Sequence, residues 1–274
     1  MKKPIFFAIF AVMLCAFVFS GYKVYSARNV YGAEERTHRE LLNLAPPEIA
    51  EMGGAPASGA GDMVESSPPG SGVSAGQSSG ADNGWLSELT AINPDTVGWL
   101  VIPNTQVDYP FVMSKDNSDY LHEDIHGDSS ASGTIFMDCA CARDFSGFNT
   151  IIYGHHMNNG SMFGTIKYFE DKPFFDANRT GTIYLPGRTL TLEIFAFMTV
   201  KPDDETIYGT AGADNAQEYL AYVKKHAELY RNIELSSSDR IVTLSTCSYA
   251  FNDARMVLIA KVANWKLDKN EPRT

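Results

Sequence analysis

Short apolar runs that follow one another from residue 97 onward constrain the fold more than any other feature of the chain. The runs are rich in Val, Ile, Thr and aromatic residues and are bounded by Gly, Pro, Asn and Asp, which predicts β-strands. Eight such short strands favour a mainly β barrel or sandwich over a doubly wound α/β fold. The predicted strands cover residues 97–102, 107–112, 133–137, 149–153, 181–185, 189–200, 240–245 and 255–264.

Helical periodicity interrupts the strands at a few points. Residues 215–230 place charged side chains between apolar ones that recur at steps of three and four, and Asp214 is suited to cap a helix there. Shorter helices are predicted at 161–169 and around Leu86 and Leu89. We therefore expect a mainly β domain with peripheral helices.

The N-terminus reads as a membrane segment. Lys2 and Lys3 precede an uncharged stretch over residues 4–22 that is rich in Ile, Phe, Val and Leu, and Lys23 follows it. This length is near the ~20 residues with which a helix crosses a bilayer, and the positive-inside rule places the bulk of the chain outside the cytoplasm. Residues 1–26 are thus predicted to be a cytoplasmic stub and single-pass anchor. A cleaved signal peptide is the alternative, since Val24-Tyr25-Ser26 offers small-residue cleavage chemistry.

A long polar region separates this segment from the ordered domain. Residues 27–52 predict a short helix above the membrane, ended by Pro46-Pro47. Residues 53–84 are dominated by Gly, Ser, Ala and Pro, a composition that predicts a flexible tether spanning on the order of 30 Å. We therefore divide the chain into an anchor (1–26), a linker region (27–84) and a folded extracytoplasmic domain (85–274).

The balance of charges and the cysteines limit the classes of function that the chain can have. The chain carries 33 acidic and 22 basic residues, for a net charge of -11, which argues against nucleic acid as a partner because such binders need a basic surface. The four cysteines (Cys15, Cys139, Cys141 and Cys247) suggest no disulfide framework. A thiol at Cys247 therefore remains available.

Cys247 ends one apolar strand, and Arg255 opens the next after a short loop. If the two strands pair as a hairpin, both residues lie at the same end of the sheet. A neighbouring positive charge favours the thiolate, and a guanidinium can bind an oxyanion. The alternative is a small core cysteine beside a surface arginine.

His155 and His156 follow the apolar strand at 149–153 and a glycine. Histidine exchanges protons near neutral pH, and catalytic groups are often displayed at strand ends. Metal binding is disfavoured, because adjacent residues of an extended chain face opposite sides and no acidic or cysteine partner has convincing spacing. The sequence therefore predicts neither a metal nor another cofactor.

Several strings taken together resemble class B sortases. They are Asn93-Pro94-Asp95-Thr96-Val97-Gly98-Trp99-Leu100, Asp108-Tyr109-Pro110, Tyr153-Gly154-His155 and Thr243-Leu244-Ser245-Thr246-Cys247 with Arg255. The similarity covers roughly residues 85–262. It implies a closed eight-stranded sortase-type β-barrel with a helix between the sixth and seventh strands, where residues 215–230 fall.

The resemblance also implies an activity. Such enzymes cleave the C-terminal sorting signal of a surface protein after Thr and transfer the acyl group to an amine of a peptidoglycan precursor or a pilin. By match to the family, Cys247 is the nucleophile, His155 exchanges the proton and Arg255 stabilises the oxyanion, while His156 is a bystander. Tyr153 and Ser245 are implied contacts of the sorting-signal peptide.

The chain departs from the family pattern at two points. The loop from Cys247 to Arg255 is short and has no acid directly after the cysteine, so loop contacts to substrate are not carried over. Cys139 and Cys141 have no counterpart and are interpreted as loop residues.

Other classes of protein remain as alternatives. A papain-like protease places Cys before His and opens a helix with the Cys, unlike this chain. L,D-transpeptidases place a Gly directly before the Cys and an Arg two residues after it, which this chain lacks. A secreted cysteine protease and a non-enzymatic, anchored β-domain that binds a partner stay open.

Overall fold

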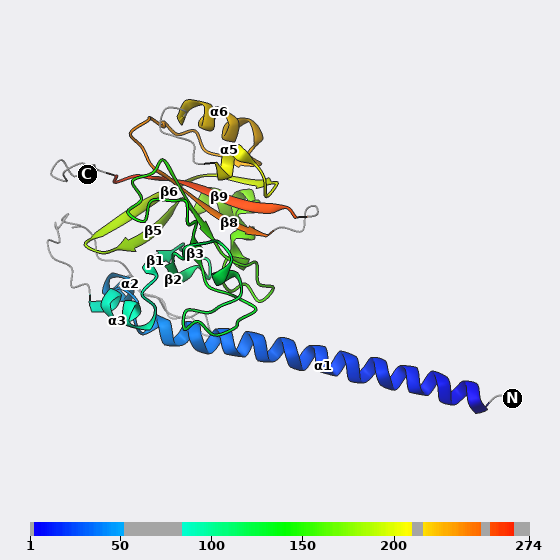
Figure 1. Ribbon diagram of the computed structural model, residues 1–274. Helices are drawn as coiled ribbons and strands as arrows, with labels where there is room; N and C mark the ends of the chain where they lie inside the picture. Colours follow the sequence, from blue (N-terminus) through cyan, green and yellow to red (C-terminus); the bar gives the residue numbers. More distant parts are fainter. Residues whose placement is uncertain (1–2, 52–83, 210–215, 248–252, 266–274) are drawn as a thin grey trace, which may run out of the picture.

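The computed structural model describes residues 3–51, 84–209, 216–247 and 253–265. Within these ranges the side chain of Cys247 is not described. The predicted tether, the cap at Asp214 and most of the loop between Cys247 and Arg255 lie outside the described residues. Figure 1 shows a barrel with helices at two sides and one long helix that extends away from it.

Eight strands close into a barrel, as the sequence predicts. The hydrogen-bonded order is β5-β1-β2-β3-β4-β8-β9-β6, and the pairing of β5 with β6 closes the ring. The pairs are antiparallel except β2 with β3 and β4 with β8, which are parallel. The strands are β1 (Thr96–Val101), β2 (Asp108–Val112), β3 (Phe136–Met137), β4 (Asn149–Tyr153), β5 (Thr180–Leu185), β6 (Arg188–Val200), β8 (Ile241–Cys247) and β9 (Arg255–Val262).

A ninth strand corrects the helix predicted at 215–230. Helix α6 (Ala216–His226) is shorter, and β7 (Leu229–Tyr230) pairs with the outer part of β6. The Glu228 and Arg231 amides donate to the carbonyls of Phe197 and Phe195, at 3.0 and 2.7 Å. Pairing with a strand edge therefore outweighs the helical pattern at its C-terminal end.

The predicted helix at 161–169 is also corrected. Met162 has a φ of 50°, a left-handed conformation that does not fit inside an α-helix. The segment instead forms the 3₁₀-helix η2 (Gly164–Glu170) and then α4 (Lys172–Ala177), whose cap Asp171 accepts from the Phe174 amide at 3.0 Å. A shorter 3₁₀-helix, η1 (Asp119–Leu121), follows β2, and α5 (Glu205–Tyr208) follows β6.

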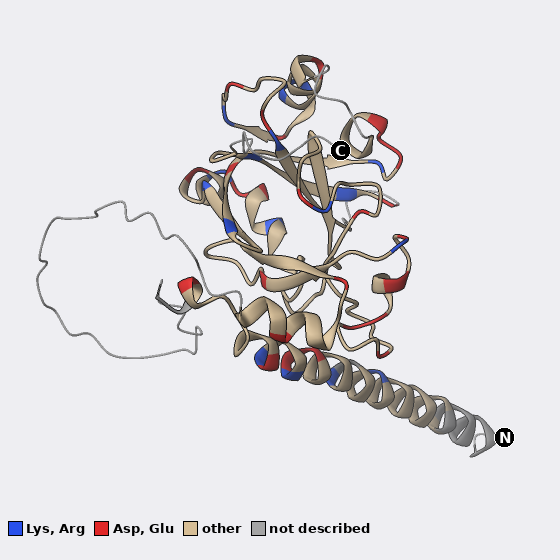
Figure 2. Cartoon of the chain, turned by 60° about the vertical axis from the view of Figure 1, so that its left-hand side comes forward, with Lys and Arg blue, Asp and Glu red and all other residues tan. Residues whose placement is uncertain are grey.

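At the N-terminus, one continuous helix replaces the separate apolar segment and short helix that the sequence predicts. Helix α1 (Lys3–Leu42) is followed by α2 (Pro47–Glu51), which begins at the second of the two prolines, and α3 (Gly84–Ile92) leads into β1. No helix, taken over the described residues, is both long enough and apolar enough to cross a membrane. Charged residues of α1 gather in the half that lies against the barrel (Figure 2).

Three groups of buried side chains hold the domain together. Alternate residues of the strands, among them Phe111, Ile152 and Leu244, fill the barrel interior. Outside, α6 packs through Tyr219 and Val223 on the outer faces of β6 and β9. On another outer face, the end of α1 and α3 pack near Trp99, through residues that include Leu41 and Leu89. Burial on both sides explains why several strands read as nearly continuous apolar runs.

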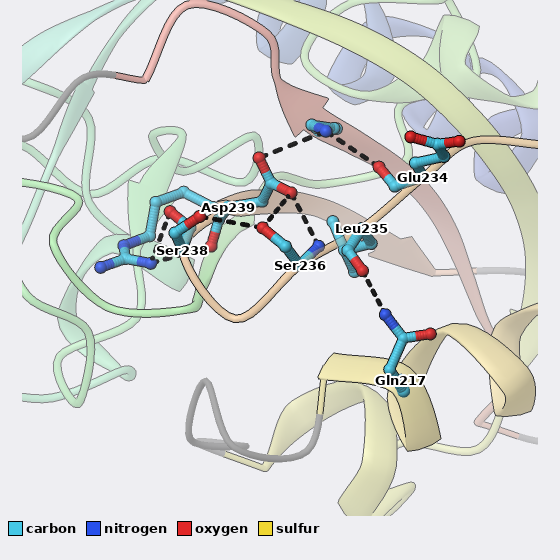
Figure 3. A network of polar contacts seen from close by, with 8 residues as sticks. Gln217, Glu234, Leu235, Ser236, Ser238 and Asp239 are labelled. Carbon is cyan, nitrogen blue, oxygen red and sulfur yellow. Dashed lines mark hydrogen bonds and ion pairs between the residues drawn. The ribbon is translucent and has the colours of Figure 1, made fainter.

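A polar network fixes the connection between β7 and β8 (Figure 3). The Asp239 carboxylate accepts from the Ser236 amide at 2.7 Å and from its hydroxyl at 2.8 Å, and pairs with the Lys261 ammonium of β9 at 3.2 Å. Lys261 also donates to the Glu234 carbonyl at 2.9 Å, and Gln217 of α6 donates to the Leu235 carbonyl. The network leads the chain back into the barrel at the start of β8.

Candidate active site

The register of three neighbouring strands brings the predicted catalytic residues to one edge of the barrel. Tyr153 of β4 pairs with Ser245 of the parallel strand β8. His155 lies two residues past the end of β4, and Cys247, two residues beyond Ser245, is the last residue of β8, so both lie at the same edge of the sheet. Cys247 in turn pairs with Arg255, the first residue of the antiparallel strand β9. The predicted hairpin between β8 and β9 is thus present.

A groove of about 250 Å³ lies at this edge of the barrel. Tyr153, His155, Ser245 and Arg255, four of the five predicted site residues, line it together. Cys247, the fifth, is placed beside it through its backbone. The groove is lined by Asn117, Leu121, Phe136, Tyr153, Gly154, His155, Pro202, Tyr208, Ser245, Thr246 and Arg255.

The His155 ring is held by a backbone carbonyl. Its Nε2 lies 2.8 Å from the carbonyl oxygen of Leu121, and because a carbonyl only accepts, Nε2 carries the proton. In the neutral ring Nδ1 is then the basic nitrogen. Gly154 precedes the histidine because a Cβ at that position would lie 2.7 Å from the Phe163 ring. The hydrogen bond to Leu121 therefore fixes the tautomer of His155. Close packing against Phe163 explains the glycine that precedes it.

His156 differs from His155 in its surroundings, though not for the reason the sequence suggests. Strand β4 ends at Tyr153, so the alternation of faces along a strand does not extend to the two histidines. His156 instead forms an isolated β-bridge with Met162 and is not among the residues that line the groove. Its predicted role as a bystander stays a prediction.

Arg255 is half-buried at the mouth of the hairpin. One guanidinium nitrogen, Nη1, donates to the carbonyls of Asp253 and Ala254, at 3.1 and 3.2 Å. These bonds hold the head group against the two residues that directly precede Arg255. A guanidinium has five N–H donors, so it can meet an anion with those that face the groove.

A buried carboxylate, that of Asp138, supports two residues that line the groove. Asp138 accepts from the Tyr153 hydroxyl at 2.9 Å and from the Asn117 amide nitrogen at 3.0 Å. Burial raises the pKa of Tyr153, and the charge of Asp138 raises it further, so the phenol stays protonated and donates. Tyr153 and Asn117, two residues that line the groove, are therefore fixed by one acid.

Ser245 is covered by another tyrosine. Its hydroxyl lies 2.8 Å from that of Tyr208, and its exposed fraction is 1%. The Tyr208 ring also stacks with that of Tyr153, with centroids 6.3 Å apart and an interplanar angle of 19°. The predicted peptide contact at Ser245 would thus involve Tyr208 as well.

Sequence reasoning missed four residues that shape the site. Asn117 and Leu121 lie in the long connection between β2 and β3, and Tyr208 lies in the connection after β6, where no periodic pattern marks a residue. Asp138 had a usable signal, because it directly follows the apolar strand β3, just as Cys247 ends β8. The rule that a polar residue at a strand end is a candidate site residue therefore applies to Asp138 as well.

The two other cysteines of the domain are now placed. Cys139 is exposed, and Cys141 is partly buried, where its sulfur accepts from the Ile151 amide at 3.4 Å. Burial raises the pKa of Cys141 to about 11, so its thiol stays protonated. Neither cysteine lines the groove. Among the described residues, no three His, Cys, Asp or Glu side chains gather in the manner of a metal site.

Comparison with known proteins gives consistent matches. The sortase domain family matches residues 100–263. Sortase B of Listeria monocytogenes is 38% identical over 183 residues, which cover 65% of this chain and 73% of that protein. A mutant form of Clostridium perfringens sortase B, at 31% identity and a TM-score of 0.67, covers 83% of this chain and 97% of its own. Sortase B from the type II pilus of Streptococcus pneumoniae, at 42% identity and a TM-score of 0.55, covers 64% and 97%.

The family match spans more than half of this chain, so the chain belongs to the sortase family. These proteins are cysteine transpeptidases that anchor surface proteins. The relatives, all class B enzymes, show further that the chain is a class B sortase, as its sequence strings suggest.

Proposed function

We propose that the chain cleaves a C-terminal sorting signal after Thr, using Cys247 as nucleophile, and passes the acyl group to an amine. The observation that carries this proposal is the strand register, which pairs Cys247 with Arg255 and pairs Ser245 with Tyr153, two residues before His155. Cysteine, histidine and arginine at adjacent strand ends supply the nucleophile, the proton carrier and the anion donor that acyl transfer needs.

The reaction proceeds in two steps. The Cys247 thiolate attacks the Thr carbonyl, Arg255 donates to the resulting oxyanion, and His155, protonated on both ring nitrogens, gives one proton to the leaving amine. The tetrahedral intermediate collapses to a thioacyl enzyme. The acceptor amine then attacks the thioester, gives its proton to His155, and releases the free thiolate with the new amide bond. Water in place of the amine gives hydrolysis, so exclusion of water favours transfer.

Tyr153 and Ser245 are proposed contacts of the sorting peptide. Tyr153 is aligned by Asp138 and meets a peptide in the groove directly, whereas Ser245, whose hydroxyl bonds to that of Tyr208, acts through Tyr208. The acceptor is an amine of a peptidoglycan precursor or a pilin lysine. The pilus named for the Streptococcus pneumoniae relative makes the second acceptor worth testing.

An anchor in the membrane at residues 1–26 is part of the proposal. Large apolar side chains on α1, among them Phe17 and Val18, are 78% and 62% exposed, which water alone disfavours. The apolar stretch at residues 4–22, with its flanking lysines, gives the orientation in which the barrel lies outside the cytoplasm.

A library of sorting-signal peptides, incubated with the full chain and either a glycine-rich or a lysine-containing amine, tests the proposal. Mass spectrometry should show cleavage after Thr and an amide to the amine. His155→Ala should lose about 10²-fold or more in kcat/KM, while the matched control His156→Ala should stay near wild type.

Other outcomes favour the alternatives. Cleavage without transfer at any amine concentration would support a cysteine protease. An inert chain whose Cys247 also resists alkylation would support a non-enzymatic binding domain, because a catalytic thiol must be reactive. Equal losses in the two histidine variants would contradict the role of His155.

A further inference from the structure

One acidic residue of α1 is buried on a helix that is otherwise mostly exposed. Glu34 is 7% exposed, whereas its neighbour Glu35 is exposed and only pairs with Arg39 on the helix surface, at 2.8 Å. A buried carboxylate is costly unless hydrogen bonds compensate it. The hydrogen-bond partners of Glu34 therefore show which residues of the barrel this part of the helix contacts.

Both oxygens of Glu34 have partners on the barrel. Oε1 accepts from the Tyr109 hydroxyl at 3.2 Å, and Oε2 accepts from the side-chain amide of Asn159 at 3.4 Å. The Tyr109 oxygen in turn accepts from the Met162 amide at 3.3 Å. Burial, and next the charge of Glu34, raise the pKa of Tyr109, so its hydroxyl is a donor to the carboxylate.

His38, one turn further along α1, fixes the same tyrosine from the side. Its ring stacks on that of Tyr109, with centroids 4.1 Å apart and an interplanar angle of 20°. Its Nε2 donates to the Asp108 carbonyl at 3.0 Å. A cavity of about 300 Å³ lies between α1 and the barrel and is lined by Glu34, Tyr109 and Met162 among others. At this point the polar contacts join helix and barrel.

Asn159 and Met162 belong to the loop that begins with the catalytic histidine. The Phe163 amide donates back to the His155 carbonyl at 3.0 Å, and His156 bridges to Met162, so residues 155–163 form one closed loop. Asn159 also holds Ser161, whose hydroxyl donates to its side-chain oxygen at 2.8 Å. A displacement of Asn159 or Met162 is thus transmitted to the backbone of His155.

We propose that Glu34, on the helix that leads out of the predicted membrane segment, is a positioning residue for His155 and acts through Tyr109 and Asn159. The inference rests on the proposed function for the role of His155. It gives a purpose to Tyr109, a residue of the Asp108-Tyr109-Pro110 string that the catalytic mechanism does not use. It also makes α1 a part of the catalytic unit.

The test uses the full chain in detergent micelles, with Glu34→Ala, Glu34→Gln and the matched control Glu35→Ala. The readouts are kcat and KM for a sorting peptide, together with hydrogen exchange of residues 155–163. Glu34→Ala should lower kcat about tenfold with little change in KM, and should speed exchange in the loop. Glu34→Gln should recover most of kcat, because its amide oxygen still accepts from Tyr109. Glu35→Ala should match wild type.

If Glu34→Ala does not fold, Tyr109→Phe, which removes only the hydroxyl, takes its place in the same measurements. Wild-type kcat and loop exchange in a folded Glu34→Ala would overturn the inference, and so would an equal loss in Glu35→Ala. If the wild-type chain itself turns over no peptide, the proposed function fails. Loop exchange then still decides whether Glu34 orders residues 155–163.

Discussion

Three polar side chains of the groove are each held by a partner from a different part of the chain. The Leu121 carbonyl holds the His155 ring, Asp138 holds Tyr153, and Tyr208 holds Ser245. Side chains fixed in this way lose less freedom when a substrate binds, and they keep the reacting groups in one geometry. The partners are thus as much a part of the site as the residues that line the groove.

Arg255→Lys should impair transfer nearly as much as Arg255→Ala, even though the positive charge is kept. A lysine ammonium is a point charge on a flexible stem, while the planar guanidinium can donate to its own loop carbonyls and to an oxyanion at once. Loss of such a donor typically costs about 10²–10³ in rate. The measurement is kcat/KM of wild type and both variants on one sorting peptide.

The rate of Cys247 alkylation against pH is the control for this comparison. If Arg255→Lys were close to wild type in kcat/KM, a general electrostatic effect on the thiolate would replace the oxyanion role.

The residues at strand ends could be predicted from the sequence, whereas their partners could not. Cys247 ends an apolar run, His155 lies just past the end of another, and Arg255 begins a third, and a polar residue stands out at each of these places. Leu121 contributes only its backbone, which leaves no sequence signal. Glu34 lies 75 residues from Tyr109, in a region whose sequence predicts a linker. No local pattern therefore indicates the contact between them.

At the scale of elements, periodicity predicted the long strands and failed where short pairings compete with it. Strand β7 has two residues and was absorbed into the pattern of α6, although the Glu228 and Arg231 amides bond to β6. The helix predicted from residue 161 was displaced because Met162 adopts a left-handed conformation. Of the strand predicted at 133–137, only Phe136–Met137 forms β3: Gly133 has a φ of 57°, and the Thr134 amide donates to the Tyr120 carbonyl at 3.0 Å.

Asp239→Ala should lower the free energy of unfolding by about 2 kcal/mol and leave kcat/KM near wild type. The carboxylate accepts two hydrogen bonds from Ser236 and pairs with Lys261, far from the groove. Chemical denaturation measures the loss. The control is Lys172→Ala, which removes an exposed pair with Asp176 and should change stability by less than about 0.5 kcal/mol.

The effect of Asp239→Ala should also depend on pH. Burial opposes ionisation of Asp239, but the bonds from Ser236 and Lys261 outweigh it and lower the pKa of the carboxyl. A lowered pKa in the folded state means that the stabilisation is present above the unfolded pKa and is lost as pH falls through the folded one. The difference from wild type should therefore shrink below about pH 4. A difference that stayed constant there would contradict the role of the charge.

For the whole molecule, the closed barrel was predictable, because eight short strands with turn signals leave few alternatives and the sortase resemblance selects one of them. The relation of α1 to the barrel was not. The sequence separates an anchor, a linker and a domain. In the structure, Glu34, which lies toward the C-terminal end of α1, joins this helix to residues 155–163 through Tyr109 and Asn159. If the anchor proposal holds, helix α1 connects the loop that begins with His155 to the membrane surface.

Trapping the acyl enzyme tests the central claim most directly. The full chain is mixed with a sorting-signal peptide without an amine acceptor, quenched in acid and digested, and the peptide that contains residue 247 is analysed by mass spectrometry. We expect the mass of the peptide's N-terminal part, ending in Thr, as a thioester on Cys247 that disappears when amine is added. Cys247→Ala should show neither adduct nor product. An adduct on Cys139 or Cys141, or turnover by Cys247→Ala, would contradict the account.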